Sequence, residues 1–410
     1  MLLCRRRPAI RLKREMRDKA SSRAFVVSDM LGQKAGCYLA TTLLCQELVQ
    51  LGLRVTCFAQ NVDFGGEPIP ITFEIVAPCV RRGCRWDWPG RCLASQARRQ
   101  IRSQEPDYVI VMGTGPLARY LLISDVANRV LIWELTNATP GNKFVDASAS
   151  RLLGRCRAML SPSAAIDRRI GETYGYTGPT LRLPFWIEDG SGRGPRTEIR
   201  KQTPEGAKAR VERNTRPPDD RLAADFIYLG RRDVEKGLHE LVRATAEVSR
   251  QFPSVRLLIA GQGSEAPFAT TARTLDMTDN VLFRFLRTRE ETMNALANSR
   301  CLVLPSYHEG YPLVLLEAAR CGVPSIATTV GSIPEMFANS QAAVLVPPRD
   351  VSALAEAMQT ILAEPPKDYE ERRKAAVELF ARLSSAEVVR TRLKNLLRQL
   401  ATLSPRATNR

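Results

Sequence analysis

The sequence predicts an α/β protein with two doubly wound domains that face a cleft, followed by a C-terminal amphipathic helix. Short apolar runs alternate with helical stretches along most of the 410 residues, and this alternation is typical of parallel sheets covered by helices. A charged segment rich in glycine and proline interrupts the pattern at residues 188–221. A chain of this length can supply two domains of ordinary size, each with its own core.

The first domain is expected at residues 24–187 and begins with a βαβ unit. Residues 24–27 and 54–59 are predicted strands, and the predicted helix between them, residues 38–50, carries leucines on one face. Later apolar runs predict further strands at residues 108–112, 130–133 and 158–162. Residues 188–221 have few apolar side chains, which indicates a linker or an inserted charged loop.

The second domain is expected at residues 222–366 and repeats the alternation. Its predicted strands are residues 225–229, 255–260, 281–283, 301–305, 325–327 and 343–346. Residues 367–400 have the apolar period of an amphipathic helix, and residues 401–410 are a tail.

The composition is that of a soluble globular protein. No apolar run approaches the roughly 18 uncharged residues of a spanning helix, and the N-terminus lacks the apolar block of a secretory signal, so the expected location is cytoplasmic. The 10 cysteines are expected to be reduced thiols. Because none of them has C-x-x-C spacing, no metal site is predicted.

The chain is strongly basic, with a formal net charge of +17. Residues 1–23 are dominated by arginine and lysine, which suits an arm that binds anionic phospholipid and holds the protein peripherally at the inner face of the cytoplasmic membrane. A solvated tail explains the same composition equally well. Nucleic acid is not an expected partner, because the chain has neither zinc-finger spacing nor an aromatic RNA-binding strand.

The segment most informative about function reads HEGYPLVLLEAARCGVP at residues 308–324. Pro312 suits the first position of a helix, and Gly322 suits its left-handed cap. Glu309 then lies in a loop and Glu317 inside the helix. The amides at the helix start favour an anion, and the two carboxylates can accept hydroxyl hydrogen bonds. Phosphate together with a polyol is the chemistry of a nucleotide sugar.

Several motifs, in order over roughly 120 residues, resemble the nucleotide-sugar domain of family 4 glycosyltransferases. Residues 230–237, GRRDVEKG, are similar to the family's G-R-x4-K-G, and LIAGQG at residues 258–263 is similar to its strand followed by G-x-G. Residues 301–306 and the E-x7-E segment resemble its P-S-x2-E-G and L-E-A elements, and GVP and GSIPE follow at residues 322–324 and 331–335. The resemblance implies the GT-B fold, in which two Rossmann-like domains face a cleft.

The resemblance assigns roles to four charged residues. Arg231 and Lys236 flank a turn just after a strand, so both cations could converge on the diphosphate and stabilise the leaving group. A charged surface loop would have the same sequence pattern. Glu309 would support the donor sugar and Glu317 would hold the ribose hydroxyls. The structural alternatives are that Glu309 caps the helix and that Glu317 is stabilised by the helix dipole near the N-terminus. The other implied donor-binding residues are Gly230, Gly261, Gly263, Gly310, Tyr311, Leu313 and Val314.

The implied reaction moves a hexose-type sugar from a nucleotide diphosphate sugar to a hydroxyl of a glycan or a lipid-linked acceptor, with retention of configuration. It would serve polysaccharide or glycolipid synthesis, and it implies neither a metal nor a cofactor. Retaining glycosidases use two carboxylates about 5 Å apart, but no second carboxylate of that kind can be identified here. The protein would therefore act by positioning and electrostatics.

The N-terminal half departs most from the family pattern. Gly36 belongs to a loop that replaces the usual Gly-Gly pair, and Gly113 and Thr114 stand on the expected acceptor side. Many members place a histidine in this domain near the donor sugar, whereas the histidines of this chain are His239 and His308. A non-catalytic GT-B subunit that partners another glycosyltransferase is therefore an alternative. A GT-B phosphorylase or epimerase and a basic nucleic-acid binder are further ones.

Overall fold

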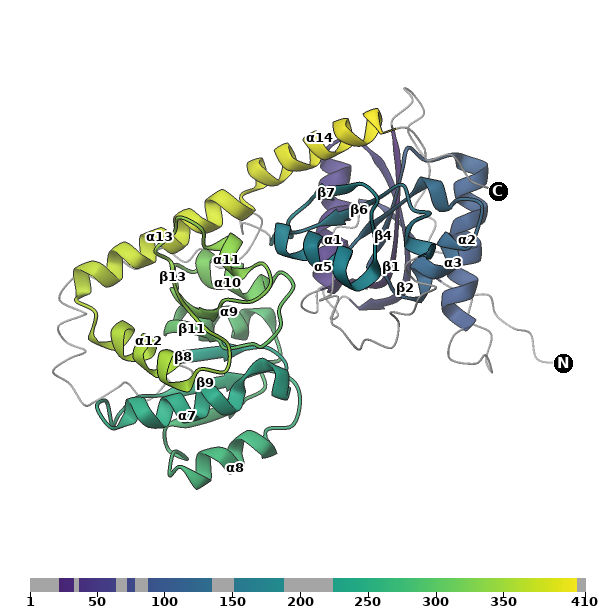
Figure 1. The fold of residues 1–410 in the computed structure, drawn as a ribbon. Coiled ribbons are helices and arrows are strands. Elements are labelled where there is room, and N and C mark those ends of the chain that lie inside the picture. The colour runs from purple at the N-terminus through teal and green to yellow at the C-terminus, as the bar shows by residue number, and fades with distance from the viewer. Residues whose placement is uncertain are drawn as a thin grey trace.

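The computed structural model describes residues 22–32, 37–63, 72–77, 88–134, 151–187 and 224–403. Within these ranges the chain forms two parallel sheets with covering helices, and long C-terminal helices run beside both (Figure 1). The predicted fold class is thereby confirmed. None of the helices in the described ranges combines the length and the apolar character needed to cross a membrane.

The N-terminal sheet has seven strands in the described residues, in the order β3-β2-β1-β4-β5-β6-β7, and all neighbours pair in parallel. The strands are β1 Arg23–Gly32, β2 Arg54–Asp63, β3 Glu74–Val76, β4 Tyr108–Met112, β5 Val130–Trp133, β6 Ala158–Ser161 and β7 Thr180–Arg182. The described helices are α1 Cys37–Gln50, α2 Trp88–Gln104, α3 Pro116–Leu122, η1 Ala127–Arg129 and α5 Ala164–Tyr174.

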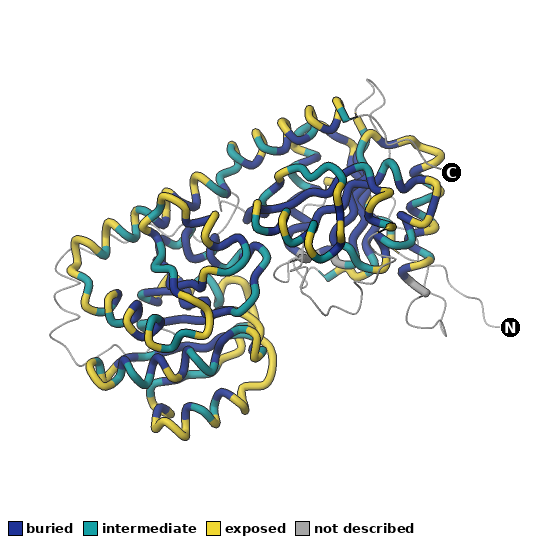
Figure 2. The backbone as a smooth tube through the Cα atoms, viewed as in Figure 1, coloured by how far each residue is buried: buried dark blue, intermediate teal, exposed yellow. Residues whose placement is uncertain are grey.

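Side chains alternate between two cores along the central strands. Val26 packs with the leucines of α1 on one face, whereas Phe25 and Val27 pack with α2, α3 and α5 on the other. Burial on both faces explains why these strands read as continuous apolar runs, and Figure 2 shows them as buried chain. The predicted βαβ unit is present, but β1 and β2 continue to Gly32 and Asp63, beyond the predicted ends.

The C-terminal sheet has six strands in the described residues, in the order β10-β9-β8-β11-β12-β13. They are β8 Ala224–Leu229, β9 Leu257–Ala260, β10 Val281–Arg284, β11 Ser299–Leu304, β12 Ser325–Thr328 and β13 Ala343–Val346. The accompanying helices are η2 Val234–Lys236, α7 Leu238–Ser249, α8 Ala266–Thr274, α9 Arg289–Ala297, α10 Leu313–Arg320, α11 Ile333–Met336 and α12 Val351–Ala363.

The C-terminal helical segment is two helices, α13 Pro366–Ser384 and α14 Ala386–Thr402, rather than one. The break lies at Ser385, whose backbone is extended (φ −61°, ψ 147°). Helix α14 packs on the N-terminal domain: Arg390 Nε lies 3.1 Å from Glu47 Oε2 of α1, and Arg157 donates to Leu403 O at 2.9 Å. The helical character of this segment was predicted correctly. The packing of α14 on the N-terminal domain was not predicted.

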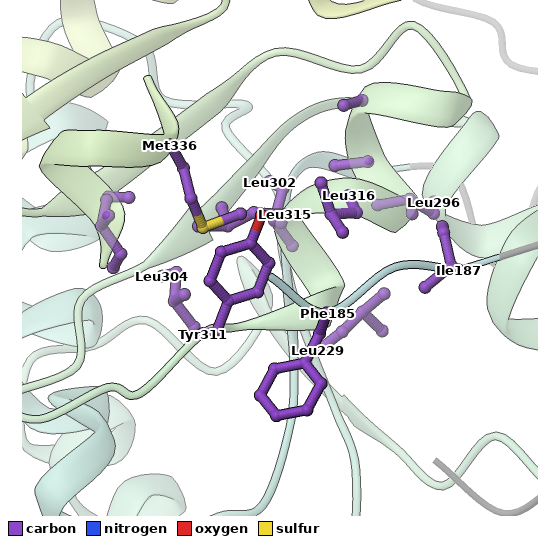
Figure 3. Close-up of a cluster of buried hydrophobic side chains, with 14 of the residues drawn as sticks. Phe185, Ile187, Leu229, Leu296, Leu302, Leu304, Tyr311, Leu315, Leu316 and Met336 are labelled. Atoms are coloured by element: carbon purple, nitrogen blue, oxygen red, sulfur yellow. The ribbon is translucent and has the colours of Figure 1, made fainter. Parts of the chain in front are cut away.

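The domains are joined at residues 183–187, which leave β7 and enter the C-terminal core. Trp133 stacks on Phe185 with ring centroids 4.6 Å apart, and Phe185 meets the ring of Tyr311 at 5.9 Å. Ile187 N donates to Ser384 Oγ at 2.9 Å, so this connection also touches the end of α13. Figure 3 shows Phe185 and Ile187 beside the leucines of α10.

Candidate functional site

Glu309 is the centre of a buried polar cluster at the end of β11. Its Oε1 accepts hydrogen bonds from Lys236 Nζ at 2.6 Å and from Ser306 Oγ at 2.7 Å. The Glu309 side chain is 12% exposed and that of Lys236 is 19% exposed. Two motifs that are 73 residues apart in the sequence thus meet in one ion pair. The two short hydrogen bonds, in a site with little exposure to solvent, hold the carboxylate in a fixed position.

Gly237 explains how Lys236 reaches this position. The turn after β8 runs through η2 and ends at Gly237, which has a left-handed backbone with φ 66°. A Cβ there would lie 2.1 Å from Pro305 O, so only glycine permits the turn to lie against the end of β11. Tyr307 N donates to Glu235 O at 2.8 Å and fixes the same contact.

Arg231 does not join the Lys236 cluster. Its Nη1 lies 2.6 Å from Asp233 Oδ2, and its side chain is 73% exposed. Tyr228 supports the turn, because its hydroxyl donates to Arg231 O at 2.6 Å. The two cations predicted to share the diphosphate therefore have different partners in this structure.

Arg232, which sequence reasoning did not single out, ties three strand-end loops together. Its guanidinium donates to Gly263 O at 3.1 Å and to Arg284 O at 2.6 Å, and the residue is buried. Gly261 (φ 151°) passes so close to the preceding loop that a Cβ would lie 1.7 Å from Gly230 O. Backbone contact between loops thus requires glycine at 261. Gly263 has a φ of 107° and its added Cβ would lie 3.1 Å from Arg232 O, whereas a Cβ on Gly230 would lie 2.6 Å from the hydroxyl of Tyr228.

Helix α10 begins one residue later than predicted. Pro312 has an extended backbone (φ −73°, ψ 108°) and is the N-cap, so Leu313 is the first helical residue. The amides of Leu313 and Val314 lie in the first turn, and Leu315 N donates to Pro312 O at 3.2 Å. Gly322 adopts the predicted left-handed conformation, with φ 63°.

Glu317 points from α10 toward α9. Its Oε1 lies 3.7 Å from Arg289 Nη1, and its side chain is 19% exposed. Burial raises the pKa of the Glu317 carboxyl above its usual value, while the nearby positive charges of Arg289 and Arg320 act in the opposite direction. Arg289 was not predicted, because nothing in its local sequence connects it with the helix.

Tyr311, predicted at the donor, has its side chain in the apolar core. It is buried among Leu304, Leu315 and Met336, with Phe185 next to it (Figure 3). Burial raises the pKa of its hydroxyl well above the usual tyrosine value. The ring therefore packs the domain junction.

The loop after β12 connects the two domains near Glu309. Ser332 Oγ donates to Ser163 Oγ at 2.6 Å, and Ser163 is the N-cap of α5. Glu335 Oε2 accepts from Ala164 N at 2.7 Å. On its other side the loop touches the Glu309 turn, since Ser332 N donates to Gly310 O at 3.1 Å. The carboxyl edges of β6 and β12 therefore face one another across the domain boundary.

A cavity of about 400 Å³ lies at this boundary. Helix α5 lines one side, and the loop after β12 together with α11 lines the other, through Ala164, Ala165, Arg168, Arg169, Glu172, Thr329, Gly331, Pro334 and Glu335. The lining is mainly polar and combines arginines with carboxylates. The space between the domains is thus suited to a polar ligand rather than an apolar one.

On the acceptor side, the structure describes two of the three predicted residues. Gly113 has φ 81° and donates from N to Trp133 O at 2.7 Å, and Thr114 Oγ1 lies 3.2 Å from the Tyr174 hydroxyl. Gly36 lies outside the described residues. His239 Nδ1 is 2.9 Å from Thr271 Oγ1, where it links α7 to α8.

Comparison with known proteins agrees with this geometry. Residues 214–378 match the family model described as Glycosyl transferases group 1. Glycogen synthase of Mycobacterium tuberculosis is 34% identical over 148 residues, which are 35% of this chain and 34% of that protein. D-inositol 3-phosphate glycosyltransferase of Mycolicibacterium smegmatis is 30% identical over 191 residues, 45% of this chain and 42% of that protein. The chain thus matches less than half the length of these relatives.

Solved structures are similar over nearly the whole chain. Sucrose-phosphate synthase from Thermosynechococcus elongatus has a TM-score of 0.72 at 19% identity, covering 93% of this chain and 100% of that one. Anabaena HepE in complex with UDP-glucose has a TM-score of 0.67 at 15% identity, covering 92% and 99%. At these identities the likeness shows the fold, which is GT-B. The similarity to group 1 glycosyltransferases lies in residues 214–378, the part of the chain whose motifs resemble the family 4 nucleotide-sugar domain.

Proposed function

We propose that the protein transfers a hexose-type sugar from a nucleotide diphosphate sugar to a hydroxyl of a glycan or lipid-linked acceptor, with retention and without a metal. The observation that carries this proposal is the pairing of Glu309 with Lys236, which unites two family motifs at the carboxyl edge of β8 and β11. Ligands of doubly wound sheets bind outside this edge. The family match and the polar cavity at the domain boundary support it.

Each charged residue has a distinct part in the proposed reaction. Lys236 already binds one carboxylate oxygen, and its other N–H groups can donate to the phosphate nearest the breaking bond. Arg231 is exposed on the same turn and can move onto the diphosphate from Asp233. Glu309 stays fixed beside the sugar, and Glu317 accepts from the ribose hydroxyls. The reaction is accelerated because positive charge lies where the leaving group becomes more negative in the transition state.

The proposal is tested by thermal stabilisation with a panel of nucleotide diphosphate sugars. Because a ligand that binds only the folded state stabilises it by about 2.7 kcal/mol at 100 times its Kd, one member should raise the Tm distinctly. The same member should release nucleoside diphosphate on incubation. Stabilisation by a free sugar phosphate instead would favour a phosphorylase or epimerase. Binding without turnover would favour the non-catalytic subunit.

Nucleotide affinity is expected to depend on the protonation of Glu317. The ribose hydroxyls donate to the ionised form, so binding is full above the raised pKa of Glu317 and weakens as the pH falls through it. Calorimetry with a nucleoside diphosphate should therefore show affinity lost on acidification and protons released on binding. Glu317→Gln should remove the part of the pH dependence that comes from this carboxyl and leave only the titration of the phosphates. An unchanged pH profile in Glu317→Gln would contradict the assignment.

The remaining parts of the proposal concern location and partners. Binding of residues 1–23 to an anionic membrane surface stays a prediction, because residues 1–21 lie outside the described ranges. We also propose a cytoplasmic location and a role in polysaccharide or glycolipid synthesis, and both are likewise predictions from the sequence. The substrate itself supplies the nucleotide, and no further cofactor is proposed.

A further inference from the structure

The carboxyl edge of the N-terminal sheet faces the other domain. Ser163 follows β6 at this edge and contacts Ser332 across the boundary. Strand β1 is three strands away from β6 in the sheet order. Since neighbouring strands lie about 4.8 Å apart, the end of β1 is about 14 Å along the edge from that contact. The end of β1 is therefore well separated from the serine contact between the domains.

The crevice between β1 and β4 is the topological switch point of this sheet. From β1 the chain continues to β2 on one side, whereas β4 is followed by β5 on the other. In doubly wound sheets ligands bind at this point, outside the carboxyl ends of the strands. Val27 pairs with Val111 in the parallel ladder, so two residues further along Asp29 is level with Gly113.

The Asp29 side chain occupies space beside Gly115 at this point. It follows Phe25 and Val27 on the same face of β1. Its Oδ2 lies 3.2 Å from the position that a Cβ on Gly115 would occupy, and Asn61 donates to its carbonyl oxygen at 3.2 Å. Gly115 thus leaves the space that the carboxylate uses. Burial raises the pKa of Asp29, which makes the carboxylate a better hydrogen-bond acceptor.

A second carboxylate lies level with Gly113 on the opposite side. Met112 pairs with Trp133, so Glu134, the residue directly after β5, is level with Gly113. Glu134 is only 1% exposed, whereas Asp29 is half-buried. Accessibility therefore distinguishes the two, because Asp29 keeps part of its surface exposed and Glu134 does not.

We propose that Asp29 is an acceptor-binding residue, whose carboxylate accepts a hydrogen bond from a hydroxyl of a neutral sugar or polyol. The inference rests on the proposed glycosyl transfer and adds the chemistry of its acceptor half. A carboxylate at the switch point attracts hydroxyl donors and repels a phosphate placed at the same spot. Gly113, which has no side chain, lets the acceptor ring approach the backbone.

The test compares transfer with donor hydrolysis in the full-length protein. The donor is the nucleotide sugar that gives the largest thermal shift, and the probes are glucose, galactose, mannose and myo-inositol. Asp29→Asn should lower transfer to the accepted probe at least about tenfold through a raised KM, as expected for a lost charged hydrogen bond. Hydrolysis of the donor and the Kd for the nucleotide should change less than about twofold, because water needs no such contact.

Two further variants make the result specific. Asp107→Asn is the matched control, because Asp107 accepts from Arg23 N at the opposite edge of the same sheet and should leave both reactions unchanged. Gly115→Ala keeps the charge but crowds the carboxylate, and should impair transfer in the same direction as Asp29→Asn. Circular dichroism and Tm of each variant exclude unfolding as the cause.

Three results would overturn the inference while leaving the proposed function intact. They are unaltered transfer in Asp29→Asn, a parallel loss of hydrolysis and nucleotide binding in that folded variant, and a wild-type protein that hydrolyses the donor but glycosylates none of the probes. Failure of the proposed function looks different, because the wild-type protein would then show neither nucleotide-sugar binding nor hydrolysis.

Discussion

Replacing Glu309 with glutamine is expected to lower the rate of sugar transfer by about 10²- to 10³-fold, with little change in nucleotide affinity. Glutamine keeps the shape and can still accept from Ser306, but it removes the negative charge opposite Lys236. The ammonium group then lacks its fixed partner and its position beside the donor is no longer set. The size of the loss reflects electrostatic stabilisation specific to the transition state.

The measurement is steady-state release of nucleoside diphosphate, together with calorimetric binding of the nucleotide. Glu356→Gln, on the exposed face of α12, is the matched control and should behave as wild type. Lys236→Met should give a comparable loss, and the double variant should lose less than the product of the two single effects, because the pair acts as a unit. Additive losses would contradict the coupled role of Glu309 and Lys236.

Gly331→Ala is expected to be strongly destabilising and to impair turnover. Gly331 has φ 56°, and a Cβ on it would lie 1.9 Å from Glu309 O, so the backbone of the Glu309 turn must move. The left-handed conformation alone costs a non-glycine residue about 1–3 kcal/mol. The collision should add at least about 2 kcal/mol to the loss in free energy of unfolding.

Gly322→Ala separates these two contributions. Gly322 has φ 63° in the same domain, but the nearest atom to its added Cβ is 3.4 Å away, so it carries the conformational cost without the collision. Denaturant unfolding and donor hydrolysis are measured for both variants. Equal stability and activity of the two alanine variants would show that the close approach of the β12 loop to Glu309 has no energetic importance.

The C-terminal domain was predicted well because its signals are local. Residues 343–346 are the predicted and the observed strand, and the other predicted strand boundaries in this domain differ from the observed ones by no more than two residues. These strands are short apolar runs bounded by glycine, proline or charged residues. Three of the motif glycines, at 237, 261 and 331, are required by a close backbone approach that tolerates no Cβ.

Other features depend on contacts that no local pattern contains. The Lys236 to Glu309 ion pair joins distant motifs, and Arg232 acts through carbonyls of two other loops. The break at Ser385 has neither a glycine nor a proline to mark it, and Ser384 is instead used by Ile187 from the other domain. The three-residue strands β3 and β7 are too short for alternation to be distinguished from loop sequence.

The paired connections between the domains also define how they can move. Residues 183–187 and the junction of α13 with α14 cross the boundary next to each other, joined by hydrogen bonds between Ile187 and Ser384. Because these two connections lie next to each other, we expect rotation about the line through them to be easier than sliding of one domain along the other. In such a rotation the displacement of a residue grows with its distance from the axis. How far a residue travels is then set by that distance and not by its own flexibility.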